Sequence, residues 1–318
     1  MKHILTIVIV TMFTSGFAPY MKAQLSKDIA SSAVDTLSKT GAAVDSLPWK
    51  YKAIAGAGFN AVQLNNWAGG GQDAVTVRGL FLGVLDFASG RFSWENDLDL
   101  GYSITKQGSQ EFRKADDRII YVTKGSWKQT DWFRWTAFVD FRTQFYLGYN
   151  YDKQDSITGE YLKISNLMAP GYLTGSLGGE WTPIPEFKLM VAPVANRTIF
   201  VLDQALADQG AFGVTPGSNI QSDFGAVINT TLLWEVVENV IWKFRGNAFM
   251  RYQEPELWVV TIENAILLKV NSFLSVGLLT DLFYDDKVSV VRDDGTVGPA
   301  TQLRNQLTID FTYTLSNF

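Results

Sequence analysis

Alternation of apolar and polar residues, repeated along most of the chain, limits the possible folds more than any other feature. In "RFSWENDLDLGYSI", Phe92, Trp94 and Leu98 share one parity, whereas Glu95 and Asp97 share the other. A period of two over this length predicts a strand with one apolar and one polar face. The same alternation recurs in "VIWKFRGNAFMRY", "LWVVTIENAILLKV" and "DFGAVINTTLLWE". The sequence therefore predicts an all-β protein.

Twelve segments carry this pattern. They span residues 50–64, 73–86, 91–104, 117–127, 132–149, 169–182, 187–201, 222–235, 240–252, 257–270, 272–284 and 303–315. Most exceed the about 9 to 11 residues that a tilted strand needs to cross a bilayer. Short connections such as "KQTD" alternate with long polar ones such as "NYDKQDSITGEYLKISN". Short turns opposite long loops predict a transmembrane antiparallel up-and-down β-barrel of about 12 strands.

The chain divides into three predicted regions. Residues 1–23 form a basic start, a short apolar run and a small residue before Gln24, which is the pattern of a signal peptide. Residues 24–48 are small and polar and predict a periplasmic N-terminal tail. Residues 49–318 contain the strands and predict an outer-membrane β-barrel, so the expected location is the cell outer membrane. An even strand count would return the C-terminus to the periplasm.

A secreted β-sandwich also has many alternating strands, but twelve long strands with alternating loop lengths fit it poorly. Tryptophan placement is a further feature that supports the barrel. Eight tryptophans fall near the predicted periplasmic strand ends: Trp49, Trp94, Trp127, Trp132, Trp135, Trp181, Trp234 and Trp242. Indole rings favour the membrane interface, so these residues predict an aromatic girdle. The chain ends in Phe318, which resembles the signal read by outer-membrane assembly machinery. Outer-membrane lipid and that machinery are therefore expected partners, and nucleic acid is not.

Few catalytic side chains are present. The chain has no cysteine, and its one histidine, His3, lies in the predicted signal peptide. Histidine-dependent and cysteine-dependent catalysis is thereby excluded from the mature chain, and we expect no enzyme, no metal site and no cofactor. "GAGFNA", Gly56 to Ala61, fits a dinucleotide fingerprint, but the alternation continues where that fingerprint needs a helix.

The polar parity of the strands predicts a network of charges inside the barrel. Its expected members are Glu95, Asp97, Asp99, Arg134, Asp140, Arg142, Lys243, Arg245 and Arg251. Small barrels fill their interior with side chains, so salt bridges across the lumen are favoured over a cation site at the three acidic residues. We expect Arg142 or Arg245 to supply the counter-charge for carboxylates such as Glu95 or Asp99.

The first external hairpin contains "FNAVQLNNWAGGGQDAVTV". Three glycines permit a tight reversal, and an exposed tryptophan beside a polar turn is a typical binding anchor. Candidate partner-contacting residues are Asn65, Asn66, Trp67, Gly69, Gly70 and Gly71. The alternative for the tryptophan is a place in the outer lipid interface.

This stretch, with "FSWENDLDLGY", "DDRI" and "FRTQFYLGY", resembles the domain of unknown function 3078 family of Bacteroidota outer-membrane proteins. The resemblance covers about Trp49 to Tyr149. It implies an outer-membrane barrel and brings no activity or catalytic residue. We expect a structural or accessory protein that docks a candidate outer-membrane partner through its surface loops. The alternative function is a narrow, porin-like passive channel for small solutes.

Overall fold

The computed structural model describes residues 48–62, 73–154, 158–271, 273–287, 289–291 and 296–316. The predicted signal peptide and the tail up to residue 47 lie outside these residues. So do residues 63–72, which include every partner-contacting candidate of the first hairpin. No helix among the described residues is long and apolar enough to cross a membrane.

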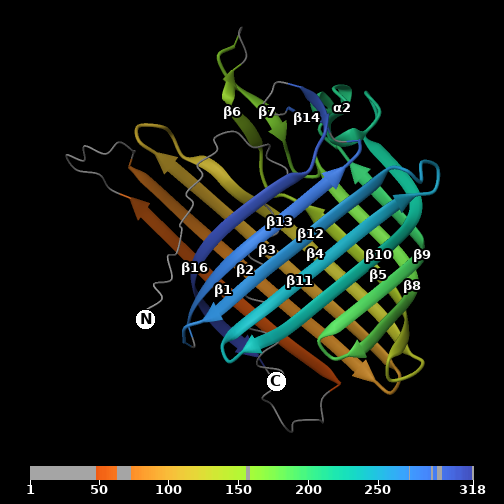
Figure 1. Cartoon of the computed structure of the whole chain (residues 1–318). Helices are drawn as coiled ribbons and strands as arrows, with labels where there is room; N and C mark the ends of the chain where they lie inside the picture. Colours follow the sequence, from red (N-terminus) through yellow and green to blue (C-terminus); the bar gives the residue numbers. More distant parts are fainter. Residues whose placement is uncertain are drawn as a thin grey trace, which may run out of the picture.

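A closed antiparallel barrel of twelve strands forms the body of the molecule (Figure 1). Its strands in chain order are β1 (Trp49–Val62), β2 (Ala74–Ser89), β3 (Phe92–Gln107), β4 (Arg113–Lys128), β5 (Phe133–Thr143), β8 (Gly171–Ile184), β9 (Phe187–Phe200), β10 (Ile220–Val237), β11 (Val240–Arg251), β12 (Trp258–Lys269), β13 (Leu274–Asp285) and β16 (Gln302–Ser316). The predicted fold class and strand count are confirmed. Each strand pairs with its neighbours in chain order, apart from the closing pair.

The closing pair joins β1 to β16. It runs over six residue pairs, from Lys52↔Ser316 to Ala57↔Phe311, whereas β1 and β2 pair over fourteen. Closure pairs the backbone groups of both strands along this seam. In a bilayer such pairing matters because hydrocarbon offers no hydrogen-bond partner.

Smaller elements lie in the loops at one end of the barrel. They are β6 (Gly148–Gln154), β7 (Tyr161–Ser165), α2 (Gln204–Asp208), η2 (Ala211–Gly213), β14 (Ser289–Val291) and β15 (Val297–Pro299). β6 pairs with β7, and β14 with β15, so two hairpins rise from the loops at the top of Figure 1. At the opposite end, the described residues join consecutive strands by short turns, which is typical of the periplasmic end of an outer-membrane barrel.

One predicted strand, 132–149, is wrong beyond Thr143. β5 ends at Thr143, and the chain then leaves the barrel wall to enter β6. The reason lies on β4, where the Asp117 carboxylate accepts hydrogen bonds from the backbone N–H groups of Phe145 and Tyr146. Those two N–H groups therefore bond to a side chain, while the chain of residues 144–149 bends outward.

The exterior and interior of the wall follow the predicted parity. Outward side chains such as Trp135, Leu278 and Phe224 are exposed, and inward ones such as Ile120 and Leu279 are buried. An exposed apolar wall is unstable in water and is the surface that a barrel presents to lipid.

All eight tryptophans that were predicted to form a girdle lie at the short-turn end of the barrel wall. Neighbouring rings contact one another there: Trp49 lies 6.0 Å from Trp94, and Trp234 lies 6.5 Å from Trp242, between ring centroids. Phe133 and Trp181 add a third pair, at 5.0 Å. This ring of aromatic side chains marks one membrane interface, because indole rings prefer that depth.

Candidate functional site

The most deeply buried charges lie on β3 and β4. The Arg118 guanidinium donates to Asp99 at 3.0 Å and pairs with Asp116 at 2.5 Å, and the side chains of Arg118 and Asp99 are 0% exposed. Gly101 on β3 leaves room for this guanidinium, because a Cβ at that position would lie 2.5 Å from its central carbon. A charge this deep requires its partners, since burial removes the stabilisation that water would give.

A second cluster joins β3, β4, β5 and β8. Lys124 pairs with Glu95 at 3.0 Å and with Glu180 at 3.1 Å, and Arg134 approaches Glu180 at 3.5 Å. Asp97 projects from the same face of β3 as Glu95. The cluster links four consecutive strands of the wall by their inward side chains.

A third cluster crosses the lumen. Arg142 on β5 makes a two-pronged contact with Asp140, at 2.6 and 2.7 Å, and lies 3.9 Å from Glu263 on β12. Glu263 also pairs with Arg245 of β11 at 3.3 Å. β5 and β12 stand on opposite sides of the strand order, so the Arg142–Glu263 contact spans the interior.

A fourth cluster lies on the wall from β8 to β13. Arg251 pairs with Asp223 and with Asp285, both at 3.2 Å, and Arg197 pairs with Asp285 at 3.4 Å. The Arg197 guanidinium also lies over the ring of Tyr172, 5.3 Å from its centroid. These contacts link β8, β9, β10, β11 and β13 through inward side chains.

Apolar side chains fill another part of the lumen. Met190, Val227, Phe249 and Val259 are buried together, and Phe138 and Phe283 pack against them from facing parts of the wall. Interlocking ion pairs and an apolar cluster therefore line the lumen and fill part of it.

The structure places all nine predicted lumen charges on inward positions but changes their pairing. Asp99 pairs with Arg118 and Glu95 with Lys124, whereas the expected counter-charges, Arg142 and Arg245, contact Glu263. Lys243 is buried on the inward face of β11. Strand parity could have identified the missed residues Arg118, Lys124, Glu180, Asp223, Glu263 and Asp285 as inward-facing. Their pairing depends on register across the barrel, which parity does not contain. Among the described residues, no group of acidic side chains is arranged to hold a metal ion.

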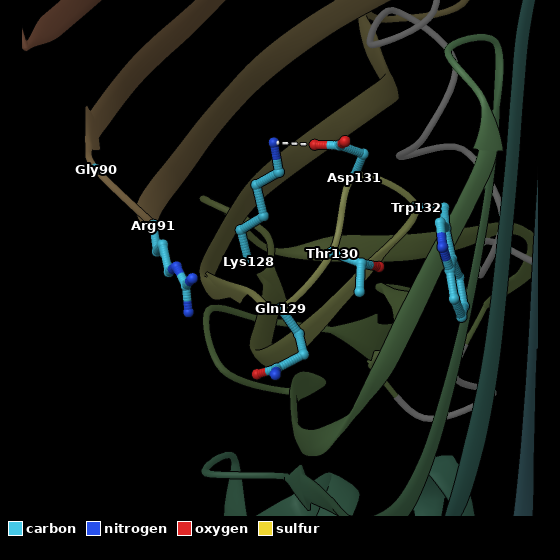
Figure 2. A pocket seen from close by; sticks show the side chains of 7 residues that line it. All are labelled: Gly90, Arg91, Lys128, Gln129, Thr130, Asp131 and Trp132. Carbon is cyan, nitrogen blue, oxygen red and sulfur yellow. Dashed lines mark ion pairs between the residues drawn. The ribbon is translucent and has the colours of Figure 1, made fainter.

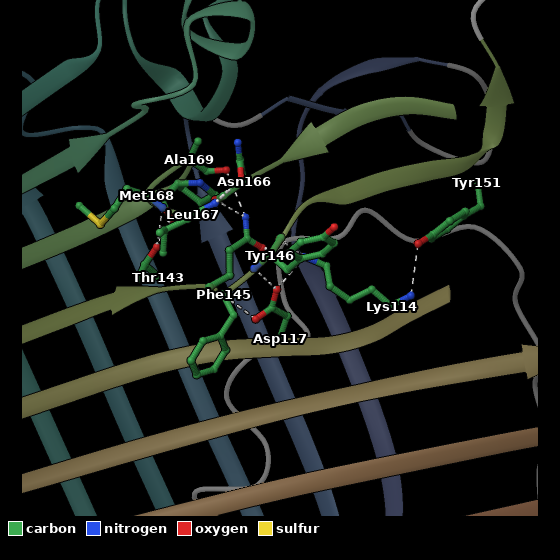
Figure 3. Close-up of polar contacts among 12 residues, drawn as sticks. Lys114, Asp117, Thr143, Phe145, Tyr146, Tyr151, Asn166, Leu167, Met168 and Ala169 are labelled. Atoms are coloured by element: carbon green, nitrogen blue, oxygen red, sulfur yellow. Dashed lines mark hydrogen bonds and ion pairs between the residues drawn. The ribbon is translucent and has the colours of Figure 1, made fainter. Parts of the chain in front are cut away.

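The loops at the other end form what we call the extracellular cap, residues 144–154, 158–170 and 201–219. Asp117 anchors it: besides accepting the two N–H groups noted above, it receives the Lys114 ammonium at 2.9 Å (Figure 3). Thr143 accepts from the N–H of Met168 at 3.0 Å and donates to the carbonyl of Pro170 at 3.1 Å. The first part of the cap is thus tied to β4 and to the end of β5.

The two loops of the cap are also tied to each other. Asp203 caps α2 by accepting from the N–H of Leu206, and it pairs with Lys163 at 2.6 Å and accepts from Asn166 at 3.0 Å. Burial acts to raise the pKa of Asp203, but the hydrogen bonds from Lys163 and Asn166 outweigh it and hold the pKa below its usual value.

An apolar core joins these loops to β9. Its buried members are Ala169, Ile199, Val201, Leu206, Ala207, Phe212 and Val214. The cap is therefore a packed structure with its own core, fixed to the barrel wall through β9.

Fold and site together define a class: the molecule is an outer-membrane β-barrel with a partly filled lumen and a packed extracellular cap. Residues 59–149 match the family model described as "Protein of unknown function (DUF3078)", so the predicted resemblance is confirmed over that stretch. No curated protein is significantly similar to the chain.

Three solved structures share the barrel architecture at low identity. The translocator domain of autotransporter NalP from Neisseria meningitidis is 8% identical, with a TM-score of 0.33, over 89% of this chain and 96% of that chain. An outer membrane channel from Pseudomonas putida F1 is 8% identical, with a TM-score of 0.38, over 86% and 100%. The P. putida toluene transporter TodX is 10% identical, with a TM-score of 0.31, over 85% and 89%. Likeness at these scores bears on neither the substrate nor the activity of this chain.

Proposed function

We propose that this protein is a non-enzymatic barrel that holds a rigid cap above the outer membrane as a docking surface for another protein. The single observation that carries the proposal is the cap itself. Loops that only connect strands need no core, whereas these two loops share buried side chains and the Asp203–Lys163 ion pair. A pre-ordered surface loses less entropy on binding than a flexible one does.

The cap also presents apolar side chains to its surroundings. Exposed members are Phe145, Tyr146, Tyr161, Leu162, Leu167 and Leu202. The rings of Tyr151 and Tyr161 make a T-shaped contact, with their centroids 5.3 Å apart. The Arg113 guanidinium lies over the Tyr151 ring, 4.8 Å from its centroid. Tyrosine and arginine are enriched among the residues that dominate binding energy at protein interfaces.

Purification in mild detergent tests the docking surface. We expect Tyr146→Ala and Leu167→Ala to remove a co-purifying protein while the barrel stays folded in unheated gels. The matched control is Leu278→Ala, which truncates an exposed side chain of β13 on the membrane-facing wall. The proposal is contradicted if the control also loses this protein, or if all three variants retain it.

A narrow passive channel is the second candidate, and one observation favours it. The side chains of Arg142 and Arg245 are 30% and 32% exposed, so water reaches part of the lumen beside the crossing contact. Conductance across a planar bilayer separates the two candidates. The partly filled lumen leads us to expect no steady conductance from the native chain, and a steady, reproducible current would establish the channel.

A further inference from the structure

The short-turn end of the barrel carries an open cavity that belongs to neither the lumen nor the cap. It has a volume of about 460 Å³ and lies between the β2–β3 and β4–β5 turns. Figure 2 shows Arg91, Lys128, Asp131 and Trp132 around it. Two cationic side chains and an indole from different turns thus face one shared space.

The charges of the cavity favour an anion. Lys128 pairs with Asp131 at 2.7 Å, and these side chains are 49% and 95% exposed. The hydrogen bond from Lys128 holds the pKa of Asp131 below its usual value, so the carboxylate is ionised at neutral pH. Arg91 is exposed, and its side chain has no ion pair with another residue in the part of the chain that the structure describes. Two cations against one carboxylate leave one positive charge, and an unpaired guanidinium is well suited to phosphate.

Apolar surface adjoins these charges. Trp127, Trp132 and Trp135 are all at least half exposed, and Phe92 pairs with Trp127 across β3 and β4. These rings belong to the girdle at the membrane interface. A free phosphate ion would use only the cations, whereas a phospholipid would use the cations and the adjoining aromatic wall together.

We propose that this cavity binds the headgroup of an anionic phospholipid of the periplasmic leaflet. The phosphate lies against Arg91 and Lys128, and the acyl chains run along the exposed indoles toward the hydrocarbon. Asp131 competes with the phosphate for Lys128, so it weakens binding. The site rests on the fold and its orientation, and it is independent of the proposed docking surface.

The test uses the full mature chain in detergent, titrated with phosphatidylglycerol or phosphatidylcholine and examined by native mass spectrometry. We expect tighter retention of phosphatidylglycerol by the native chain. Arg91→Gln should weaken it about fivefold, as expected for the loss of one interfacial cation. Asp131→Asn should strengthen it, because Lys128 is released.

Lys269→Gln is the matched control, since it removes a cation at the same end of the barrel, on β12, away from the cavity. It should leave phosphatidylglycerol binding unchanged. Equal retention of the two lipids overturns the proposal, as does an Arg91→Gln effect no larger than that of the control. Displacement of phosphatidylglycerol by millimolar inorganic phosphate would also overturn it, because the cavity would then be a free-anion site. Unheated gel mobility establishes that each variant is folded.

Discussion

Substitution of Arg118 tests how much the buried ion pairs of the lumen contribute to stability. Replacing it with methionine removes the guanidinium but keeps an unbranched side chain of similar length. Asp99, which is 0% exposed, would then keep a buried charge without its partner, and Asp116, 13% exposed, would lose its contact as well. Breaking a buried pair in this way costs about 3 to 5 kcal/mol of unfolding free energy. For a chain of this size that corresponds to a fall in Tm of roughly 5 to 8 °C.

The assay is thermal unfolding in detergent, followed by circular dichroism and by the loss of the compact band in unheated gels. The control is Lys287→Gln, which removes a surface ion pair with Glu254 whose side chains are 31% and 42% exposed. Exposed pairs contribute about 0 to 1 kcal/mol, so the control should shift Tm far less.

A double variant separates lost charge balance from lost packing. Arg118→Met with Asp99→Leu replaces the two fully buried members of the cluster by apolar groups, and only the partly exposed Asp116 keeps its charge. Replacing both members of a buried pair in this way is often neutral or stabilising. It should recover much of the lost Tm. If Arg118→Met matches the control, or if the double variant is less stable than Arg118→Met alone, the reasoning from buried charge is refuted.

Three further outcomes are expected. Gly101→Ala should lower Tm in the same direction, because the added Cβ meets the Arg118 guanidinium; an unchanged Tm would mean that the guanidinium moves freely. The pKa of Asp203 is lowered on folding, so its stabilisation of the cap is present at neutral pH and is lost as pH falls below about 4. Cleavage of residues 203–214 by a protease should therefore increase below that pH. In the Asp203→Ala variant, these residues should be cleaved readily at every pH. Ala55→Cys with Tyr313→Cys should form a disulfide across the seam of this cysteine-free chain, visible as a reducible mobility shift; a chain that stays reduced under oxidising conditions argues against closure.

The sequence determined the wall of the barrel. Alternation decides which face of each strand meets lipid, and strand lengths near the thickness of a bilayer decide that the segments span it. Twelve strands, their order and the positions of the tryptophans follow from local pattern, because each depends only on residues close in the chain. The departure at residues 144–149 needed Asp117, which lies far away in sequence and captures two backbone N–H groups there.

Only the tertiary structure decided which inward charges meet. Parity placed Arg142 in the lumen, but its contact with Glu263 joins strands on opposite sides of a closed barrel. That contact depends on barrel closure and on the register of every strand pair between β5 and β12. The cap follows the same rule: its sequence mixes polar and apolar residues without a regular period. Asp203 and Lys163, forty residues apart, meet because the ends of β8 and β9 stand side by side in the wall.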